Sequence, residues 1–463
     1  MSARRMRCAA ATVLLVAGCA AGPDYRRPDM TLPAAYKEAA GWKPAQPGDQ
    51  FARGKWWEIF GDGDLNVLMD GVEVSNQNLK VAAARYRQSL ALAEGARASF
   101  LPLLTANLSS TRSRAPTARA GTDPGIAANH NLSLGASWEL DIWGRIRRQV
   151  ESGDAGAQAS AADLEAARLS LQAELATNYF QLRVSDAQRQ LLDDTVAAYE
   201  KSLELTRNRY AAGVAARADV VQAEAQLKST QAQALDTGVQ RAQLEHAIAV
   251  LLGRAPGDFA LVAAKFNTTM PAIPSGLPSA LLERRPDIAA AERRVASANA
   301  QIGVAKSAYF PALTFAASGG YSSTTFAKWL TAPNRFWSLG PSFAEALIDF
   351  GKRGAAFDQA VAGYDQSVAT YRETVLESFQ QVEDNLAALR ILDEEATVQD
   401  GAVRAARESV LLTTNQYKAG TVSYLNVVTV QATQLANERT AVGILGRRLA
   451  AAVGLIRALG GGW

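Results

Sequence analysis

The residues of this chain that could carry out chemistry are few and widely separated. His130 and His246 are the two histidines, one beside a predicted strand and one in a predicted helix. Neither a metal pair nor a histidine-based catalytic triad can be assembled from them. Gly61-Asp62-Gly63-Asp64 looks like the start of a calcium loop, but the remaining ligand spacing and the closing glutamate are missing. We therefore read it as a turn and helix cap, and expect no enzyme activity, metal or cofactor.

One covalent modification is predicted at the beginning of the chain. Three arginines precede a short apolar stretch, residues 9–18, which ends in Leu15-Val16-Ala17-Gly18-Cys19. This resembles a bacterial lipobox, so residues 1–18 are predicted to be a signal peptide and Cys19 the lipid attachment site. The next residue is Ala20, not the aspartate that commonly retains lipoproteins at the inner membrane, which favours the outer membrane. The alternative is an ordinary signal peptide with an incidental cysteine.

Charge and cysteine content exclude several classes of protein. The formal charge of +3 comes from 48 basic and 45 acidic residues, and three of the arginines lie in residues 1–18. The rest of the chain is therefore near neutral and is not expected to bind nucleic acid. The other cysteine, Cys8, lies in the predicted signal peptide, so neither a disulfide nor a cysteine metal site is expected.

An internal repeat organises the chain. Asn78-Leu79 through Leu101-Pro102 matches Asp287-Ile288 through Phe310-Pro311 at an offset of 209. At an offset of 207, Trp143-Gly144-Arg145 matches Phe350-Gly351-Lys352, and Tyr210-Ala211-Ala212-Gly213 matches Tyr417-Lys418-Ala419-Gly420. Each copy is predicted to run helix, strand, loop, strand, very long helix, tight turn, long helix. The expected divisions are a signal peptide at 1–18, a lipid-anchored tether and equatorial segment at 19–65, repeats at 66–252 and 281–463, and a Pro-rich connector and equatorial segment at 253–280.

Four segments alternate between apolar and polar residues, which is the period of a β-strand. They are Leu104–Ser109, Leu132–Leu140, Leu313–Tyr321 and Trp337–Phe343. Aromatic residues near the ends fit membrane strands with an apolar outer face and a wet interior, joined by surface loops at 111–128 and 324–335. A half-buried sheet of a soluble sandwich is the alternative. In a membrane, four strands leave two open edges and enclose no pore, so several chains are needed, and three would supply twelve strands, within the known range of about 8 to 26.

Two helices are predicted to be far longer than those of a globular domain. They run from about Arg147 to Tyr210 and from about Arg353 to Tyr417, roughly 90 Å each. Apolar residues in the second follow steps of three, four or seven, as in a coiled-coil seam, at Phe357, Val361, Tyr364, Val368, Tyr371, Val375, Val382 and Leu389. Each helix ends in a tight turn, at Ala212-Gly213-Val214 or Ala419-Gly420-Thr421, where glycine suits the left-handed conformation past a helix end.

At this point the sequence resembles the outer membrane factors, the TolC-like channel proteins, in their NodT/OprM-type lipoprotein branch. The motifs that carry the resemblance are Trp56-Trp57-Glu58-Ile59-Phe60, Leu281 through Ile288 with its Arg-Arg-Pro-Asp-Ile stretch, Tyr309-Phe310-Pro311, and Tyr417-Lys418-Ala419-Gly420. The resemblance covers essentially the whole chain after the signal peptide. It implies an α+β membrane protein, a homotrimer whose twelve-strand β-barrel in the outer membrane continues into a long α-helical coiled-coil barrel in the periplasm.

The resemblance also implies the function and the partners. The protein would be the passive exit duct of a tripartite efflux system for drugs, toxic organics or metal ions. It would dock to a periplasmic adaptor and, through it, to an inner-membrane pump of the RND, MFS or ABC class. The tip residues Gly213, Val214, Gly420 and Thr421 would face the adaptor. An exit duct for proteins or polysaccharides is one alternative, and a lipid-anchored coiled-coil scaffold without a pore is another.

Four residues near the tips are predicted to form the periplasmic aperture. Three copies of Asp219 would make an acidic ring that filters cations, although Asp219 also fits a helix N-cap. The second tip has Asn426 where some relatives have aspartate, and it has Val422 where some have arginine. A salt-bridged lock is therefore in doubt, and we expect a gate held by packing, with Tyr417 and Tyr424 narrowing it.

Overall fold

The structure is a computed structural model of the chain, and it describes residues 20–30, 35–38, 55–114, 126–264, 270–271 and 284–461. The predicted lipid attachment site, Cys19, and the signal peptide lie outside the described residues. By internal contacts the chain forms two compact units. Unit 1 comprises residues 1–29, 85–161 and 290–372, and unit 2 comprises residues 30–84, 162–289 and 373–463. Each unit therefore contains segments from both copies of the repeat.

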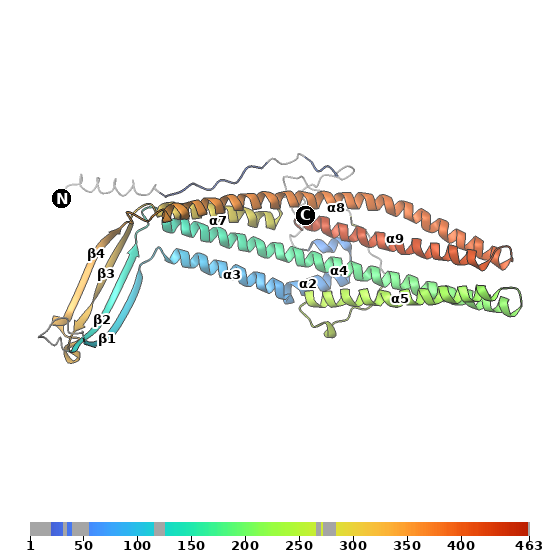
Figure 1. The fold of residues 1–463 in the computed structure, drawn as a ribbon, viewed down its shortest axis with the longest axis horizontal. Coiled ribbons are helices and arrows are strands. Elements are labelled where there is room, and N and C mark those ends of the chain that lie inside the picture. Colours follow the sequence, from blue (N-terminus) through green and yellow to red (C-terminus); the bar gives the residue numbers. More distant parts are fainter. Residues whose placement is uncertain are drawn as a thin grey trace. The chain divides into compact units, whose positions relative to one another are not determined.

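The order of elements confirms the predicted repeat (Figure 1). The first copy contains α3 (Gln77–Ala98), β1 (Leu103–Arg114), β2 (Ile126–Glu139), α4 (Arg145–Ala211) and α5 (Arg217–Leu251). The second copy contains α7 (Pro286–Ser307), β3 (Ala312–Ser323), β4 (Arg335–Ala344), α8 (Lys352–Lys418) and α9 (Tyr424–Ala458). The short elements are η2 (Trp56–Phe60), α2 (Gly63–Ser75), η3 (Pro256–Asp258), η4 (Phe326–Lys328) and η5 (Ala332–Asn334).

The long helices and the strands form where the sequence pattern placed them. Both α4 and α8 have 67 residues, and both α5 and α9 have 35. β1 and β2 reach further than predicted, into the segment expected to be a loop, so that β1 ends at Arg114 and β2 begins at Ile126. The reason is that a ladder of paired backbone groups continues past the last apolar residue of β1, where alternation can no longer be read.

The sheet of unit 1 has the order β1-β2-β3-β4, and every neighbouring pair is antiparallel. Residues directly opposite each other lie on the same face. One face is apolar, and its members include Leu108, Leu132, Leu134, Trp337 and Leu339. The other face is polar, with Asn107, Ser133 and Ser318 among its members. Within the described residues, β1 and β4 each have one edge without a partner strand.

Residues 20–30 contain no helix or strand and are held by α4 and α7. The buried Arg148 donates to the carbonyl oxygens of Ala21 and Gly22 and pairs with Asp24 at 2.9 Å. The amide of Asn299 donates to the Pro23 carbonyl oxygen at 3.0 Å. Both helices therefore bind the backbone of this segment, and its side chains add contacts, since the Tyr25 hydroxyl donates to Glu292 at 2.7 Å.

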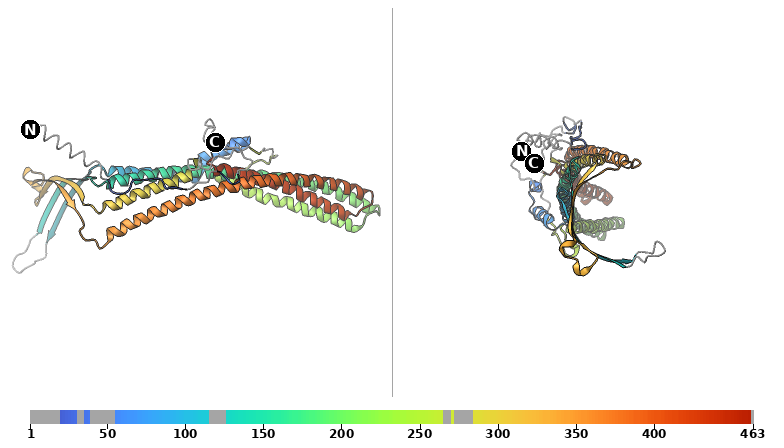
Figure 2. Two further views of the ribbon diagram at one scale, coloured as in Figure 1. Left: turned by 90° about the horizontal axis from the view of Figure 1, so that it is seen from above. Right: turned by 90° about the vertical axis from the view of Figure 1, so that its left-hand side faces the viewer.

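The core of unit 2 lies along two helical hairpins, α4–α5 and α8–α9, which run side by side to their turns (Figure 2). A buried charge network ties the connector to the first hairpin. Arg183 pairs with Asp186 at 3.2 Å and donates to the Val262 carbonyl oxygen. Arg241 pairs with Asp186 at 2.7 Å and donates to the Leu261 carbonyl oxygen. A buried pair broken on one side leaves an uncompensated charge, so this network fixes the connector strongly.

Among the described residues, no helix combines the length and the apolar character that a membrane-spanning helix needs.

Candidate functional site

The two hairpin turns are built in the same way. Gly213 and Gly420 have φ of 73° and 79°, the left-handed conformation that favours glycine. The Val214 amide donates to the Arg209 carbonyl oxygen at 2.9 Å, and the Thr421 amide donates to the Gln416 carbonyl oxygen at 3.0 Å. These bonds from the residue after the glycine, back across the last turn, are those of a Schellman motif. The glycines are therefore helix C-caps, and each cap satisfies carbonyl groups that would otherwise lack partners.

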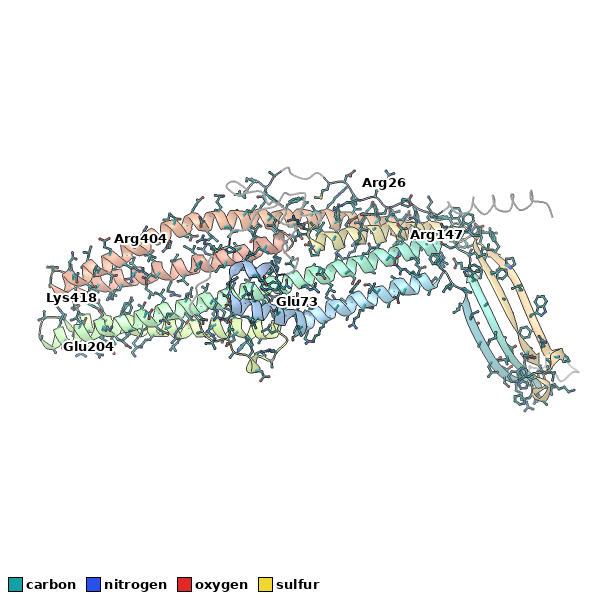
Figure 3. The ribbon with its side chains drawn as sticks, turned by 180° about the vertical axis from the view of Figure 1, so that it is seen from behind. Arg26, Glu73, Arg147, Glu204, Arg404 and Lys418 are labelled. Carbon is teal, nitrogen blue, oxygen red and sulfur yellow. The ribbon has the colours of Figure 1, made fainter. Side chains whose placement is uncertain are left out.

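The four predicted tip residues are exposed at these turns. The side chain of Val214 is 64% exposed, and Gly213, Gly420 and Thr421 are exposed as well. The Thr421 hydroxyl donates back to the Gln416 carbonyl oxygen at 3.0 Å, which fixes it against the end of α8. Lys418 lies at the end of that helix (Figure 3). The four predicted residues thus present a small, uncharged surface with one large apolar side chain, that of Val214.

Behind the tips the two hairpins are joined by a cluster of buried side chains, which we call the tip cluster. Its members are Tyr199, Leu203, Ala223, Leu227, Tyr417, Tyr424 and Val427. Tyr417 is 4% exposed and Tyr424 is 2% exposed, with ring centroids 5.2 Å apart. In this conformation neither ring can line an opening, because both are covered by side chains of their own chain. They hold the hairpins together instead.

Two polar contacts cross from the first hairpin to the second. The guanidinium of Arg209 lies 4.7 Å from the centre of the Tyr417 ring and donates to the Lys418 carbonyl oxygen at 3.1 Å. The hydroxyl groups of Ser202 and Tyr424 lie 3.0 Å apart. Arg209 and Ser202 were missed at the sequence level. Comparison of the copies offers one signal, because the position of Arg209 is occupied by Gln416 in the second copy.

Burial controls the ionisation of the tip cluster. Burial raises the pKa of Tyr424 above its ordinary value of 10.0, against the opposing hydrogen bond from Ser202, and the nearby Asp219 adds to the rise. Burial likewise raises the pKa of Tyr199. Both phenols are therefore neutral over the physiological range and act as packing and hydrogen-bonding groups.

Asp219 occupies the third position of α5. The N-cap of α5 is Ala216, which makes no side-chain cap hydrogen bond, so the interpretation of Asp219 as an N-cap is wrong. The capping pattern was misread because α5 begins two residues before Asp219, at Arg217. A carboxylate in the first turn is still favoured by the helix dipole. Asp219 is half-buried, and no ion pair joins it to another described residue.

Asn426 lies on the exposed face of the first turn of α9. Val422, by contrast, packs against the tip cluster. The structure therefore brings Tyr417, Tyr424 and Val422 together, places Asp219 beside Tyr424, and leaves Asn426 at the surface.

The other chemical motifs have structural roles. Asp62 is the N-cap of α2 and accepts from the Leu65 amide at 3.1 Å, while Gly61 ends η2 with φ of 63°. This confirms the turn and helix cap predicted for Gly61-Asp62-Gly63-Asp64. In the described part of the chain, no group of three or more potential ligands is placed to hold a metal ion.

Comparison with known proteins places this architecture in a family. The family model described as "outer membrane efflux protein" matches residues 68–254 and 277–461, once for each copy of the repeat. The efflux pump outer membrane protein TtgC of Pseudomonas putida, described as probable, is 30% identical over 98% of this chain and 95% of its own length. The pyoverdine export outer membrane protein OpmQ of Pseudomonas aeruginosa is also 30% identical, over 97% of this chain and 95% of its own.

The fold agrees with these relatives. The solved structure of the outer-membrane channel OprN has a TM-score of 0.89 and 31% sequence identity, and the match covers 96% of this chain and all of that one. The duplicated helical hairpins, the four-stranded sheet and the family match over both copies lead to one conclusion. This chain belongs to the outer membrane efflux protein family, and it is an outer-membrane channel component of an efflux pump.

Proposed function

We propose that the chain is one protomer of a homotrimeric exit duct that carries substrates passively across the outer membrane. It would receive them from an inner-membrane pump of the RND, MFS or ABC class through a periplasmic adaptor. The observation that carries the proposal is the sheet of unit 1. Its apolar face is open, its other face is polar, and both β1 and β4 have a free edge within the described residues.

The free edges support the trimer. Unpaired backbone groups are costly in lipid, so β1 of one protomer would pair with β4 of the next. That pairing is antiparallel, like the rest of the sheet. Three protomers would then close a twelve-strand barrel with the apolar face toward lipid and Asn107, Ser133 and Ser318 toward the lumen.

The helical seam supports contacts between protomers as well. In unit 2, the seam residues Val375, Val382 and Leu389 of α8 are buried within the single chain. In unit 1, the seam residues Phe357, Val361 and Val368 are only partly buried. Neighbouring protomers would cover this second group and complete a helical barrel.

The names of the relatives suggest the substrates. Proteins named as toluene, solvent and antibiotic efflux pump components are among them, together with a pyoverdine export protein. We propose that this chain exports toxic organic molecules or drugs of that size, that the pump selects them, and that the duct itself performs no catalysis. Cys19 would carry the lipid that anchors the N-terminal segment.

The tips would form the periplasmic end of the duct. Exposed Val214 and Thr421, with the two glycines, would contact the adaptor. The tip cluster would hold the closed state by packing, and Asp219 would form an acidic ring with its two symmetry mates. Opening would require the hairpins of one chain to separate, which costs the contact between Arg209 and Tyr417 and the hydrogen bond between Ser202 and Tyr424.

Planar-bilayer recording of the purified protein tests the proposal. The wild type should give single-channel steps. Tyr424→Ala should raise the conductance because it removes a buried ring from the tip cluster, and Asp219→Ala should weaken the preference for cations. Tyr210→Ala, which alters the exposed tyrosine of the first copy, is the matched control. Unchanged current and selectivity in both variants would contradict the gate, and a complete lack of channel steps would contradict the duct.

A further inference from the structure

The apolar face of the sheet changes character at one end. We call this the loop end, where β1 leads to β2 and β3 leads to β4. Two arginines lie there on the same face as the apolar residues, because Arg112 continues the row of Leu108 and Arg335 stands opposite Tyr321. These arginines are the basic rim. At the opposite end of the strands the charged groups include the acidic Glu139, paired with Arg145, and the acidic Asp141 and Glu345.

The basic rim lacks compensating acids on its own elements. No aspartate or glutamate occurs in the described residues of the four strands except Glu139, and none occurs in residues 324–334. Arg112 and Arg335 form no ion pair with a described residue. Lys328, in η4, adds a further positive charge to the same end. The loop end of an otherwise apolar face therefore carries two arginines that no described acid neutralises.

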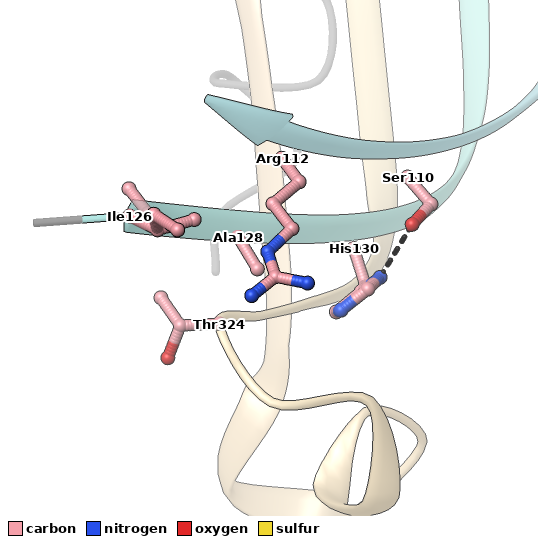
Figure 4. Close-up of a pocket in the computed structure, with 7 residues that line it drawn as sticks. Ser110, Arg112, Ile126, Ala128, His130 and Thr324 are labelled. Atoms are coloured by element: carbon pink, nitrogen blue, oxygen red, sulfur yellow. Dashed lines mark hydrogen bonds between the residues drawn. The ribbon is translucent and has the colours of Figure 1, made fainter. Parts of the chain in front are cut away.

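Arg112 lines a built hollow within this rim (Figure 4). The hollow has a volume of about 580 Å³ and is also lined by Ser110, Ala128, His130 and Thr324. Its polar groups converge, since the hydroxyl of Ser110 lies 2.7 Å from Nδ1 of His130, and the guanidinium of Arg112 reaches between His130 and Thr324. Such a combination of one guanidinium with hydroxyl donors suits the oxygens of a phosphate group.

Aromatic residues hold the hollow in place. The His130 ring packs against Phe326, with centroids 5.4 Å apart, and against Trp329, with centroids 5.8 Å apart. The indole of Trp329 donates to the Tyr321 carbonyl oxygen at 3.2 Å. This ties the β3–β4 connection back to the sheet. Tyr321 and Trp337 stand just inside the rim on the same face, at the level where aromatic residues mark a membrane interface.

We propose that the basic rim binds the phosphate groups of anionic glycolipid in the outer leaflet, with Arg112 as the principal ligand. The inference rests on the proposed function, which puts the apolar face against lipid. The acyl chains would lie along Leu108, Leu132 and Leu339, continuous with the rim. A free phosphate ion would use the same donors, but nothing in it would use the adjoining apolar strip. The geometry therefore assigns the site to a lipid phosphate.

Binding of diphosphoryl lipid A to the purified full-length protein in detergent, followed by native mass spectrometry, tests this inference. Arg112→Gln should weaken binding about tenfold or more, since a hydrogen bond to a charged group contributes about 1.5 to 3 kcal/mol. Arg404→Gln, at an exposed position of α8, makes the same charge change elsewhere and should bind like the wild type (Figure 3). Lipid A without phosphates should bind weakly to all three proteins.

Each other outcome overturns the inference. Equal binding by Arg112→Gln and wild type would show that the basic rim is not the binding site. Equal weakening by Arg404→Gln would show that binding depends only on the positive charge of the protein. Competition by inorganic phosphate would show that the hollow binds a free phosphate ion. No binding of lipid A at all would show that the hollow is not a lipid site. If Arg112→Gln fails to fold, two variants replace it in the same binding assay. They are Arg112→Lys, which keeps the charge, and Thr324→Val. Normal single-channel steps in these variants separate failure of the lipid site from failure of the duct.

Discussion

Tyr210 and Tyr417 occupy the same position in the two copies, yet Tyr417 is buried and Tyr210 is 46% exposed. Tyr417 packs against Tyr424, whereas the first copy has Arg217 at the position of Tyr424, and the residue before each tyrosine differs as well. Arg209 covers the ring of Tyr417, whereas the second copy offers Gln416 in the place of Arg209 and cannot cover Tyr210 in the same way. A cation–π contact contributes about 0.5 to 2 kcal/mol. These differences between the copies break the internal symmetry where the hairpins join.

The raised pKa values of Tyr199 and Tyr424 predict alkaline opening of the tip cluster. The folded state favours the neutral phenols, while the unfolded state ionises them near the ordinary value of 10.0. The stabilisation is therefore complete below about pH 10 and is lost as the pH rises toward the folded pKa values. Hydrogen exchange at amides of the tips should accelerate above about pH 10 more steeply in the wild type than in a Tyr199→Phe/Tyr424→Phe variant.

The control for this experiment is Tyr210→Phe, which alters an exposed tyrosine and should follow the wild type. Each comparison is made at one pH, because the chemical rate of exchange itself depends on pH. The double variant should also be less stable at neutral pH, by about 1 to 2 kcal/mol, since it loses hydrogen bonds to Ser202 and Gln226. Identical pH dependence in the double variant and the wild type would show that the phenols do not control opening.

At the scale of elements, the turns depend on glycine for its backbone alone. A Cβ added at Gly420 would meet no atom within 4 Å, so space is not the constraint. The constraint is the φ of 79°, because an L-residue in that conformation costs about 1 to 2 kcal/mol. Gly420→Ala should therefore lower the free energy of unfolding of the α8–α9 hairpin by about 1 kcal/mol, measured by hydrogen exchange of amides near the turn.

Gly238 provides the matched control, because it lies within the regular helix α5 and a Cβ there also meets nothing within 4 Å. Gly238→Ala should stabilise its helix by about 0.5 to 1 kcal/mol, since alanine loses less backbone freedom on folding. The same substitution would thus have opposite signs at the two sites. Equal signs would refute the assignment of Gly420 to the left-handed cap.

The elements could be predicted from sequence because their signals are local. Alternation predicted the strands, heptad spacing predicted the long helices, and the glycine in each Tyr-x-Ala-Gly stretch predicted the turns. The partners inside the site could not be predicted, because Ser202 and Tyr424 are 222 residues apart in sequence. The burial of Tyr417 depends on Arg209 of the other hairpin, so the sequence around Tyr417 alone does not reveal it. Likewise, the hollow at Arg112 depends on a strand register that alternation alone does not determine.

At the scale of the whole molecule, the repeat and the compact units do not coincide. Each unit buries contacts between the two copies, such as the hydrogen bond of Ser152 with Ser297 in unit 1 and that of Ser202 with Tyr424 in unit 2. A single copy would therefore lack the partners of these contacts in both units. The sheet also lacks partners, since its two edges are unpaired within the part of the chain that the structure describes.

Cross-linking between β1 and β4 tests whether neighbouring chains complete these edges. Asn107→Cys and Ser338→Cys lie on the polar face of the two edge strands, and the natural cysteines are only Cys8 and Cys19. A flexible bismaleimide should join these positions between protomers and give covalent dimers and trimers on a denaturing gel. Ser137→Cys with Ala316→Cys, which face each other inside one sheet, should give only monomers. If the edge pair also gave only monomers in membranes, the edges would not meet, and the closed trimeric wall would be disproved because no other described strand can satisfy them.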